Sequence, residues 1–131
     1  MEAMEKNVAM VLGHDPIDND HAEFIALLRR LNAATNADFP ALFQQLYEHS
    51  ERHFERENQL MQQYAYPAET EHKSEHQRIL GEFSQFKTRV DKGLITFGRS
   101  FVKERLPQWF ELHVVTMDSA LAAHIKTASC G

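Results

Sequence analysis

The stretch DNDHAEFIALLRRLNAAT, residues 18–35, has the periodicity of a helix with one apolar face. Its apolar residues and one histidine recur three and four positions apart, a spacing that places them on one side of a helix. Asp18 has a side chain that suits the N-cap position. We therefore predict a helix that begins at Asp18 and buries one face. The residues of that face are His21, Phe24, Ile25, Leu28 and Leu31.

Two further helices are expected in the middle of the chain. The second helix should begin near residues 38–40, Asp-Phe-Pro, because aspartate caps helices and proline is tolerated in the first turn. Tyr66-Pro67 then interrupts the chain, and Gly93 is the expected stop of the third helix. Both helices carry histidines together with apolar residues on or near one face.

A fourth apolar pattern of helical spacing runs from Phe97 to Ile125 and contains Pro107. Proline disrupts a helix interior, so we expect a kink near Lys103 or a helix that restarts there. Four helices of about twenty residues with short connections predict an all-α, up-down-up-down antiparallel four-helix bundle. We expect one domain over residues 1–131, with the bundle at 18–126 and an N-terminal arm, 1–17, lying against it.

The composition limits the classes of partner. The charged side chains of the 131 residues sum to −5, whereas nucleic-acid binding needs a basic face, so no nucleic-acid partner is expected. The single cysteine, Cys130, forms no internal disulfide and suits a reducing compartment. The longest apolar run near the N-terminus, residues 8–12, is too short for a signal peptide or a membrane span. We expect a cytoplasmic protein that is not inserted into a membrane.

Eight histidines in 131 residues form the unusual feature of this sequence. Spacings of four, at 53/57 and 72/76, place both side chains of each pair on one helix face, one turn apart. In an antiparallel bundle these faces converge on one axis. Five imidazoles and two carboxylates would be costly there as unpaired polar groups, and two metal ions explain them. The seven candidate ligands are His21, His53, Glu57, His72, His76, His113 and Asp118.

The ligand types narrow the choice of metal. Imidazole with carboxylate suits iron, manganese or zinc, and the absence of a nearby thiolate disfavours copper(I) and iron–sulfur clusters. If both carboxylates and a hydroxide bridge two octahedral ions, the seven side chains leave one coordination position open. The sequence offers no obvious general acid or base beside such a site.

The motifs of this chain stand in a characteristic order: IDNDH (17–21), HFxxE (53–57) followed by Met61, YP (66–67), HxxxH (72–76) and WxxxHxxxxD (109–118). Together they resemble the hemerythrins, specifically the single-domain bacterial hemerythrins, over residues 12 to about 125. Each motif alone is a weak signal, since HxxxE is common in ordinary helices. The ordered set of seven on four helices is a strong one.

The resemblance implies two non-haem irons with a bridging oxo or hydroxo group. One iron, coordinatively saturated, would be completed by His72, His76 and His113. The other, with the open position, would be held by His21 and His53. Glu57 and Asp118 would bridge the two. In this family dioxygen binds reversibly at the open iron and is held as hydroperoxide, which implies a carrier, store or sensor rather than an enzyme.

Several positions depart from the usual family pattern. Asp20 stands where a glutamine is usual, and Asn58 where a second acid is usual, so contacts behind the ligands are expected to differ. The usual N-terminal tryptophan is missing. Phe24 and Phe110 stand where leucine is common, which bears on the size and accessibility of the pocket.

Four apolar residues are helical neighbours of the candidate ligands. We expect some of them to form walls around the open position, where they would keep water and anions out. The alternative is that they only pack the core. The four are Phe24, Phe54, Phe110 and Val114.

Asp118 presents a geometric difficulty. Five steps of about 100° place it some 140° from His113 on a regular helix. Either Asp118 reaches in from the flank of the helix, or the helix widens there into a π-bulge. We favour the flank reach.

The remaining candidates are expected to play lesser parts. His49 lies one turn before His53 and competes with it as a ligand, but the phenylalanine after position 53 selects His53, which leaves His49 in an outer layer or at the surface. We expect His14 and His124 to be solvated and Trp109 to pack the bundle rather than relay electrons. Glu69, Glu71 and Glu75 suit the first turn of a helix, and Cys130 belongs to the tail.

Other functions stay open beside reversible oxygen binding. They are a diiron enzyme or detoxifying protein acting on peroxide or nitric oxide, iron storage, and a purely structural bundle. Oxygen-activating diiron bundles use more carboxylates and fewer histidines, so this ligand set favours binding. We expect a monomer, and the protein that receives the oxygen is not specified by the sequence.

Overall fold

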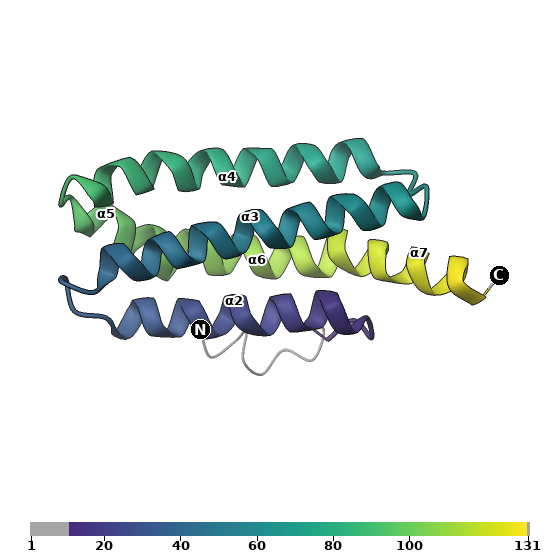
Figure 1. Ribbon diagram of the computed structural model, residues 1–131, viewed down its shortest axis with the longest axis horizontal. Helices are drawn as coiled ribbons and strands as arrows, with labels where there is room; N and C mark the ends of the chain where they lie inside the picture. Colours follow the sequence, from purple (N-terminus) through teal and green to yellow (C-terminus); the bar gives the residue numbers. More distant parts are fainter. Residues whose placement is uncertain (1–10, 131) are drawn as a thin grey trace.

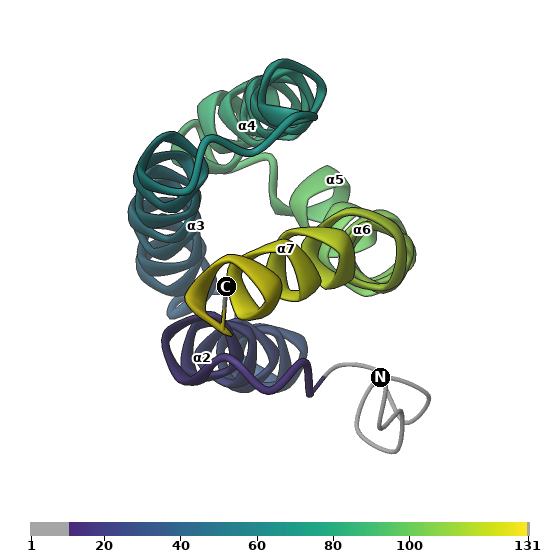
Figure 2. The same ribbon diagram turned by 90° about the vertical axis from the view of Figure 1, so that its right-hand side faces the viewer.

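A computed structural model describes residues 11–130, and these residues fold into helices without a strand. Three long helices come first: α2 (Asp15–Ala33), α3 (Phe39–Gln63) and α4 (Glu69–Asp91). A fourth helical stretch follows as α5 (Ile95–Ser100), η2 (Phe101–Arg105), α6 (Leu106–His113), η3 (Val114–Asp118) and α7 (Ser119–Cys130). The four stretches lie side by side along the molecule (Figure 1) and surround a common centre when viewed from the end (Figure 2). The prediction of an all-helical fold of four helices is confirmed.

The first helix begins three residues earlier than predicted. His14 is its N-cap, and His14 Nδ1 accepts a hydrogen bond from the Ile17 N–H at 3.3 Å. The prediction of Asp18 as N-cap is therefore wrong. The Asp18 carboxylate instead accepts hydrogen bonds from the backbone N–H groups of Leu12 and Gly13, at 2.8 and 3.0 Å, and ties the preceding segment to the first turn. Of the expected N-terminal arm, residues 1–10 lie outside the described residues.

The predicted limits of the second and third helices agree with the structure. Phe39 begins α3 with Pro40 in its first turn, although Asp38 makes no side-chain capping hydrogen bond. After α4, Gly93 adopts a φ of +87°, which glycine reaches without steric cost. Its N–H donates to the carbonyl of Val90 and the next N–H, of Leu94, donates to that of Arg89. This paired closure is a Schellman motif, and it ends the helix as expected.

The fourth stretch contains two wide, π-helical turns. In the first, η2, the N–H of Leu106 donates to the carbonyl of Phe101, five residues earlier. Pro107 follows directly, and it has no N–H to continue an ordinary helical ladder. The expected disturbance near Lys103 is thus present, and it takes the form of a π turn.

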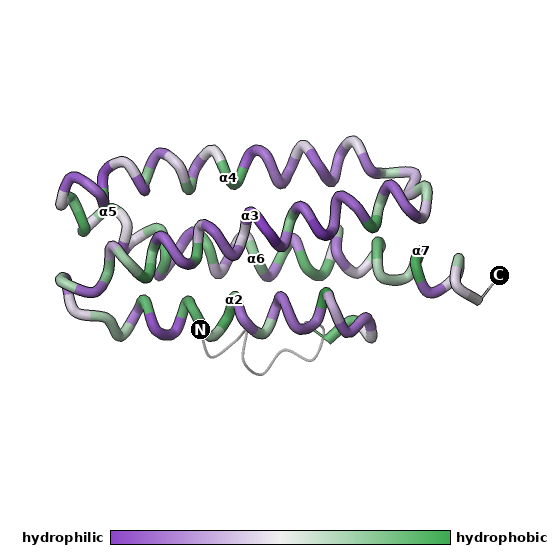
Figure 3. Tube along the Cα trace, in the orientation of Figure 1, coloured by the Kyte–Doolittle hydropathy of each residue, from purple (hydrophilic) through white to green (hydrophobic). Residues whose placement is uncertain are grey.

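Apolar and polar residues alternate along each helix with helical spacing (Figure 3). The larger apolar cluster includes four buried rings, Phe39, Phe43, Phe83 and Phe101, which contact one another. A smaller cluster consists of Ile17, Met61, Leu121 and Ile125. Buried polar side chains of all four helical stretches lie in the same interior. Within the described part of the chain, no helix is both long and apolar enough to cross a membrane.

Candidate metal centre

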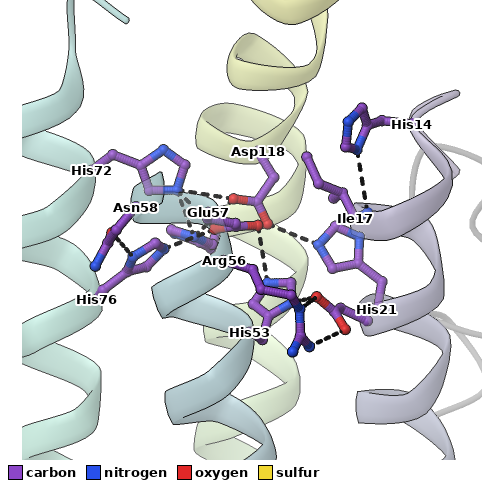
Figure 4. A network of polar contacts seen from close by, with 12 residues as sticks. His14, Ile17, His21, His53, Arg56, Glu57, Asn58, His72, His76 and Asp118 are labelled. Atoms are coloured by element: carbon purple, nitrogen blue, oxygen red, sulfur yellow. Dashed lines mark hydrogen bonds and ion pairs between the residues drawn. The ribbon is translucent and has the colours of Figure 1, made fainter. Parts of the chain in front are cut away.

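The seven residues singled out by their spacing are brought together in the interior of the bundle. Figure 4 labels all of them except His113. None of these residues is more than 5% exposed. α2 supplies one of them, α3 two, α4 two, and the fourth helical stretch two. The pairs on α3 and α4 point inward together because residues four apart share a helix face. The seven are His21, His53, Glu57, His72, His76, His113 and Asp118.

A π turn aligns Asp118 with His113. The segment η3 widens the helix, and its closing hydrogen bond runs from the Ser119 N–H to the Val114 carbonyl, five residues back. Because one extra residue fits into this turn, positions five apart come to the same side. His113 Nε2 lies 3.1 Å from Asp118 Oδ1, and the Asp118 side chain is fully buried. The flank reach that we favoured from the sequence is wrong, and the π-bulge alternative is what the structure contains.

The Glu57 carboxylate lies between two groups of imidazoles. Its Oε2 atom is 2.9 Å from His53 Nε2. Its Oε1 atom is 2.9 Å from His76 Nε2 and 3.4 Å from His72 Nε2. The two oxygens of one carboxylate therefore face opposite sets of nitrogen atoms.

The Asp118 carboxylate repeats this division. Its Oδ2 atom is 2.9 Å from His21 Nε2, whereas Oδ1 is 3.0 Å from His72 Nε2. Oδ1 also faces His113, as described above. One oxygen of each carboxylate thus faces the trio from α4 and α6, and the other faces a histidine of α2 or α3. The donor atoms form two sets that share both carboxylates.

The charges at this centre are strongly coupled. Burial alone would lower the pKa of His53, but the Glu57 charge and hydrogen bonds to Asp20 and Glu57 raise it to about 10. Burial would also lower the pKa of His72, but hydrogen bonds to Asp118 and Glu57 raise it to about 9. The pKa values of the two carboxyls lie below their ordinary values despite burial, because interactions with neighbouring histidines lower them. The carboxylates therefore require positive charge beside them.

The donor set fits metal ions better than protons. Among the described residues, several buried atoms of this cluster make no hydrogen bond of good geometry: His76 Nε2, both Glu57 oxygens and Asp118 Oδ1. Buried polar atoms without partners are costly, and they call for a ligand. Imidazole nitrogen and carboxylate oxygen, with no sulfur, are donors that suit iron. Two ions of charge +2 would satisfy these atoms and supply the positive charge.

Comparison with known proteins agrees with this geometry. The family described as the hemerythrin HHE cation binding domain matches residues 12–126. This chain belongs to the hemerythrin family. A bacteriohemerythrin of Ralstonia nicotianae (strain ATCC BAA-1114 / GMI1000) is 34% identical over 118 residues, which cover 90% of this chain and 85% of that protein. No solved structure gives a significant match. Family membership implies non-haem iron binding, and the seven-residue cluster could hold metal ions.

Two of the departures from the usual hemerythrin pattern, Asp20 and Asn58, contact histidines of the centre. Asp20 Oδ2 lies 3.1 Å from His53 Nδ1, and the Asp20 carboxylate also accepts hydrogen bonds from the Arg56 guanidinium. Burial would raise the pKa of Asp20, but the His53 and Arg56 contacts lower it to about 2. Asn58 Oδ1 lies 3.1 Å from His76 Nδ1. These polar partners behind the ligands fix the orientation of two imidazole rings.

A small cavity adjoins the centre. Its volume is about 10 Å³, at the lower limit of what holds a single water molecule. Phe24 and Phe110 stack on each other there, with ring centroids 4.3 Å apart. Val114 is buried in the core nearby and does not line the cavity. The lining residues are Phe24, Ser50, His53, Phe54, Trp109, Phe110, His113 and Asp118.

Ser50 was missed by reasoning from the sequence. It lies on the inward face of α3, three residues before His53, and its side chain is 1% exposed. The signal that could have found it is this spacing, because residues three apart share a helix face.

Three histidines outside the centre are less solvated than expected. His49 is buried, with Nε2 3.1 Å from the Asp20 carbonyl and Nδ1 3.3 Å from a Glu23 oxygen, so the surface position is wrong. His124 is half-buried, with Nε2 2.7 Å from the Tyr64 carbonyl. His14 is half-buried as the cap of α2. In each case a nearby main-chain group supplies a hydrogen-bond partner for the ring.

Trp109 links the centre to a surface network. Its ring stacks on His113 at 4.5 Å, and its indole N–H donates to Glu75 at 2.7 Å. Glu75 also pairs with Arg78. Glu75 thus reaches the tryptophan and no imidazole directly, while Glu69 pairs with Lys73. The side chain of Cys130 lies outside the described residues.

Proposed function

We propose that this protein binds dioxygen reversibly, as a carrier, store or sensor, at a centre of two non-haem irons. One observation carries the proposal: two buried carboxylates each divide their oxygens between two sets of imidazoles, beside a small cavity. Family membership and the bacteriohemerythrin relative support it. The up-down-up-down order of the four helices belongs to the same proposal.

The assignment of ligands follows from the two sets of donor atoms. His72, His76 and His113 would hold one iron, and His21 and His53 the other. Glu57 and Asp118 would bridge them, together with an oxo or hydroxo group. When bound, the iron pair supplies the electrons for reversible binding of dioxygen. Because the second set has fewer histidines, an exogenous ligand would bind on that side.

The rest of the site excludes water and holds the geometry. Phe24, Phe54 and Phe110 form apolar walls of the cavity. Phe54 also stacks on His76, with ring centroids 4.1 Å apart, which limits rotation of that imidazole. Dry walls would hinder water and anions from reaching the centre, and so would protect a reversibly bound ligand.

Metal content and reversibility test the proposal together. The chain is loaded with ferrous iron without oxygen, and elemental analysis should then find two irons per chain. Exposure to air should produce a visible absorption band that disappears when oxygen is removed, over several cycles. One metal per chain, or steady consumption of oxygen or peroxide without return of the starting spectrum, would reject the carrier in favour of an enzyme or an iron store.

A pair of histidine variants sharpens the test. His113→Ala removes a proposed ligand and should lower the iron content to one or none. His49→Ala removes a buried histidine outside the seven and should leave two irons. Equal losses in both variants would contradict the assignment. Cytoplasmic location and the monomeric state stay predictions from the sequence.

A further inference from the structure

Of the described residues that line the cavity, Ser50 is the one that is neither aromatic nor a member of the seven-residue centre. Ser50 is 1% exposed, and its Oγ atom has no hydrogen-bond partner among the described residues. A buried hydroxyl without a partner carries a free-energy cost, and each such group in a folded protein needs an explanation.

An ordinary structural role does not account for this hydroxyl. Serine in a helix interior commonly donates back to the carbonyl four residues earlier. Thr116 and Ser119 do this in the same chain, with oxygen–oxygen distances of 2.6 and 2.7 Å. Ser50 does not, and it borders the cavity together with His53 and Asp118. The hydroxyl is therefore free to donate to whatever occupies that space.

We propose that Ser50 is the hydrogen-bond donor for the small ligand that enters the cavity, and that it favours ligands with an acceptor atom carrying negative charge. This inference rests on the proposed function, since the ligand would bind at the iron pair. The cavity is no larger than one water molecule, so the ligand class is the smallest available, a diatomic that gains negative charge or a small anion, with one end bound at the centre. A hydrogen bond to a charged acceptor is stronger than one between neutral groups.

The other candidate occupant is a single resident water. A buried water usually makes about three hydrogen bonds. Polar residues are among those that line this cavity, but almost all of its wall surface is apolar and offers few partners. A ligand held at one end by the centre needs only one further donor. The geometry therefore favours a ligand of the centre as the acceptor for Ser50.

Azide is a suitable probe, because it is a small anion whose infrared stretch responds to hydrogen bonding. The iron-loaded, oxidised full chain is titrated with azide as wild type, as Ser50→Ala and as Ser84→Ala. Ser84 is exposed on α4 and provides a matched control for loss of a serine hydroxyl. We expect Ser50→Ala to bind azide about tenfold more weakly, and Ser84→Ala to bind it as wild type does.

Deuteration gives a second readout. In the wild-type complex, the azide stretch should shift between H₂O and D₂O, and the shift should be lost in Ser50→Ala. Unchanged affinity in Ser50→Ala overturns the proposal, as does a wild-type azide band that ignores deuteration. Either result would mean that the hydroxyl serves a resident water or no ligand at all.

Failure of the proposed function would look different. In that case wild type would bind fewer than two irons or give no azide complex, whatever residue stands at position 50. The melting temperature of the iron-free chain supplies a further check. Because the hydroxyl has no protein partner, Ser50→Ala should melt at or slightly above the wild-type temperature, whereas a structural hydroxyl would lower it on removal.

Discussion

The phenylalanine cluster (Phe39, Phe43, Phe83 and Phe101) and the seven-residue metal centre lie in the same bundle but are stabilised in different ways. The four rings are at most 2% exposed and contact one another with centroids 5.1 to 6.3 Å apart. Their stability comes from apolar burial, which depends on neither pH nor metal. The centre is buried equally well but contains charges and unpaired donor atoms. Its stability depends on what binds to it.

This comparison shows how one small fold can be rigid and still contain a site whose buried polar atoms destabilise it. Polar atoms in an interior destabilise unless they are satisfied. The apolar clusters on the same helices hold the chain in place, so that the seven side chains stay assembled. Function is thus concentrated in the part of the interior that contributes least to stability when the metal is absent.

Removal of iron should produce the largest effect. A ligand present at a thousand times its dissociation constant stabilises the folded state by about 4 kcal/mol, so two ions contribute roughly 8 kcal/mol. Chelation should lower the melting temperature by more than 20 °C, followed by circular dichroism. Amide exchange should accelerate around Glu57 more than around Phe43. Equal acceleration at both places would show that the two regions are not independent.

The pH dependence should reverse between the iron-free and iron-loaded chains. Without iron, the folded-state pKa values of His53 and His72, about 10 and 9, lie above the ordinary 6.5. Folding therefore takes up protons, and this stabilisation is complete below pH 6.5 and lost as pH rises through 9 and 10. Each pKa unit corresponds to about 1.4 kcal/mol, so the free energy of unfolding should fall by several kcal/mol over this pH range.

Iron-loaded protein should behave in the opposite way on the acid side. Ligand imidazoles must be neutral, so protonation below about pH 6.5 competes with iron and promotes its release. Urea unfolding at pH 6, 8 and 10, with and without iron, measures both trends. An iron-free chain that gains stability between pH 7 and 10 would contradict the charge coupling described for the centre.

The sequence predicts the helical fold, including the apolar cluster, more completely than it predicts the details of the metal centre. Helical spacing and the pairs at 53/57 and 72/76 were enough to predict a helical fold and to nominate seven residues that the structure brings together. Ordinary helical geometry could not determine the position of Asp118, because the π turn depends on the packing of the whole fourth stretch. Burial of His49 was also missed, since its partners, the Asp20 carbonyl and Glu23, come from another helix.

Truncation of a ring in the phenylalanine cluster should destabilise the folded protein without changing its iron content. Phe43→Ala leaves a cavity among the other rings and should cost about 3–5 kcal/mol of unfolding free energy. Because its ring lies in the apolar cluster, the iron content should stay that of the wild type. Urea unfolding and elemental analysis provide the two measurements.

Phe110→Ala is the matched comparison for Phe43→Ala. This ring is also buried, but it lines the cavity beside the centre. The cost in stability should be similar, while oxidation in air and azide binding should become faster. If Phe110→Ala leaves the rates of oxidation and azide binding unchanged, as Phe43→Ala should, the phenylalanines at the cavity only pack the core, like those of the cluster.

The smallest effects should come from two glycines that differ only in what surrounds them. A Cβ atom at Gly98 would lie 2.5 Å from Val90 Cγ2 and 3.1 Å from a ring carbon of Phe39, whereas one at Gly81 would meet nothing within 4 Å. Overpacking should make Gly98→Ala destabilising by about 1–3 kcal/mol. Gly81→Ala, inside α4, should stabilise by roughly 0.5–1 kcal/mol, because alanine loses less backbone entropy than glycine. The urea midpoints of the two variants should move in opposite directions at unchanged iron content. If Gly98→Ala raised the midpoint as Gly81→Ala does, the α5 contact would tolerate a methyl group and the overpacking argument would be wrong.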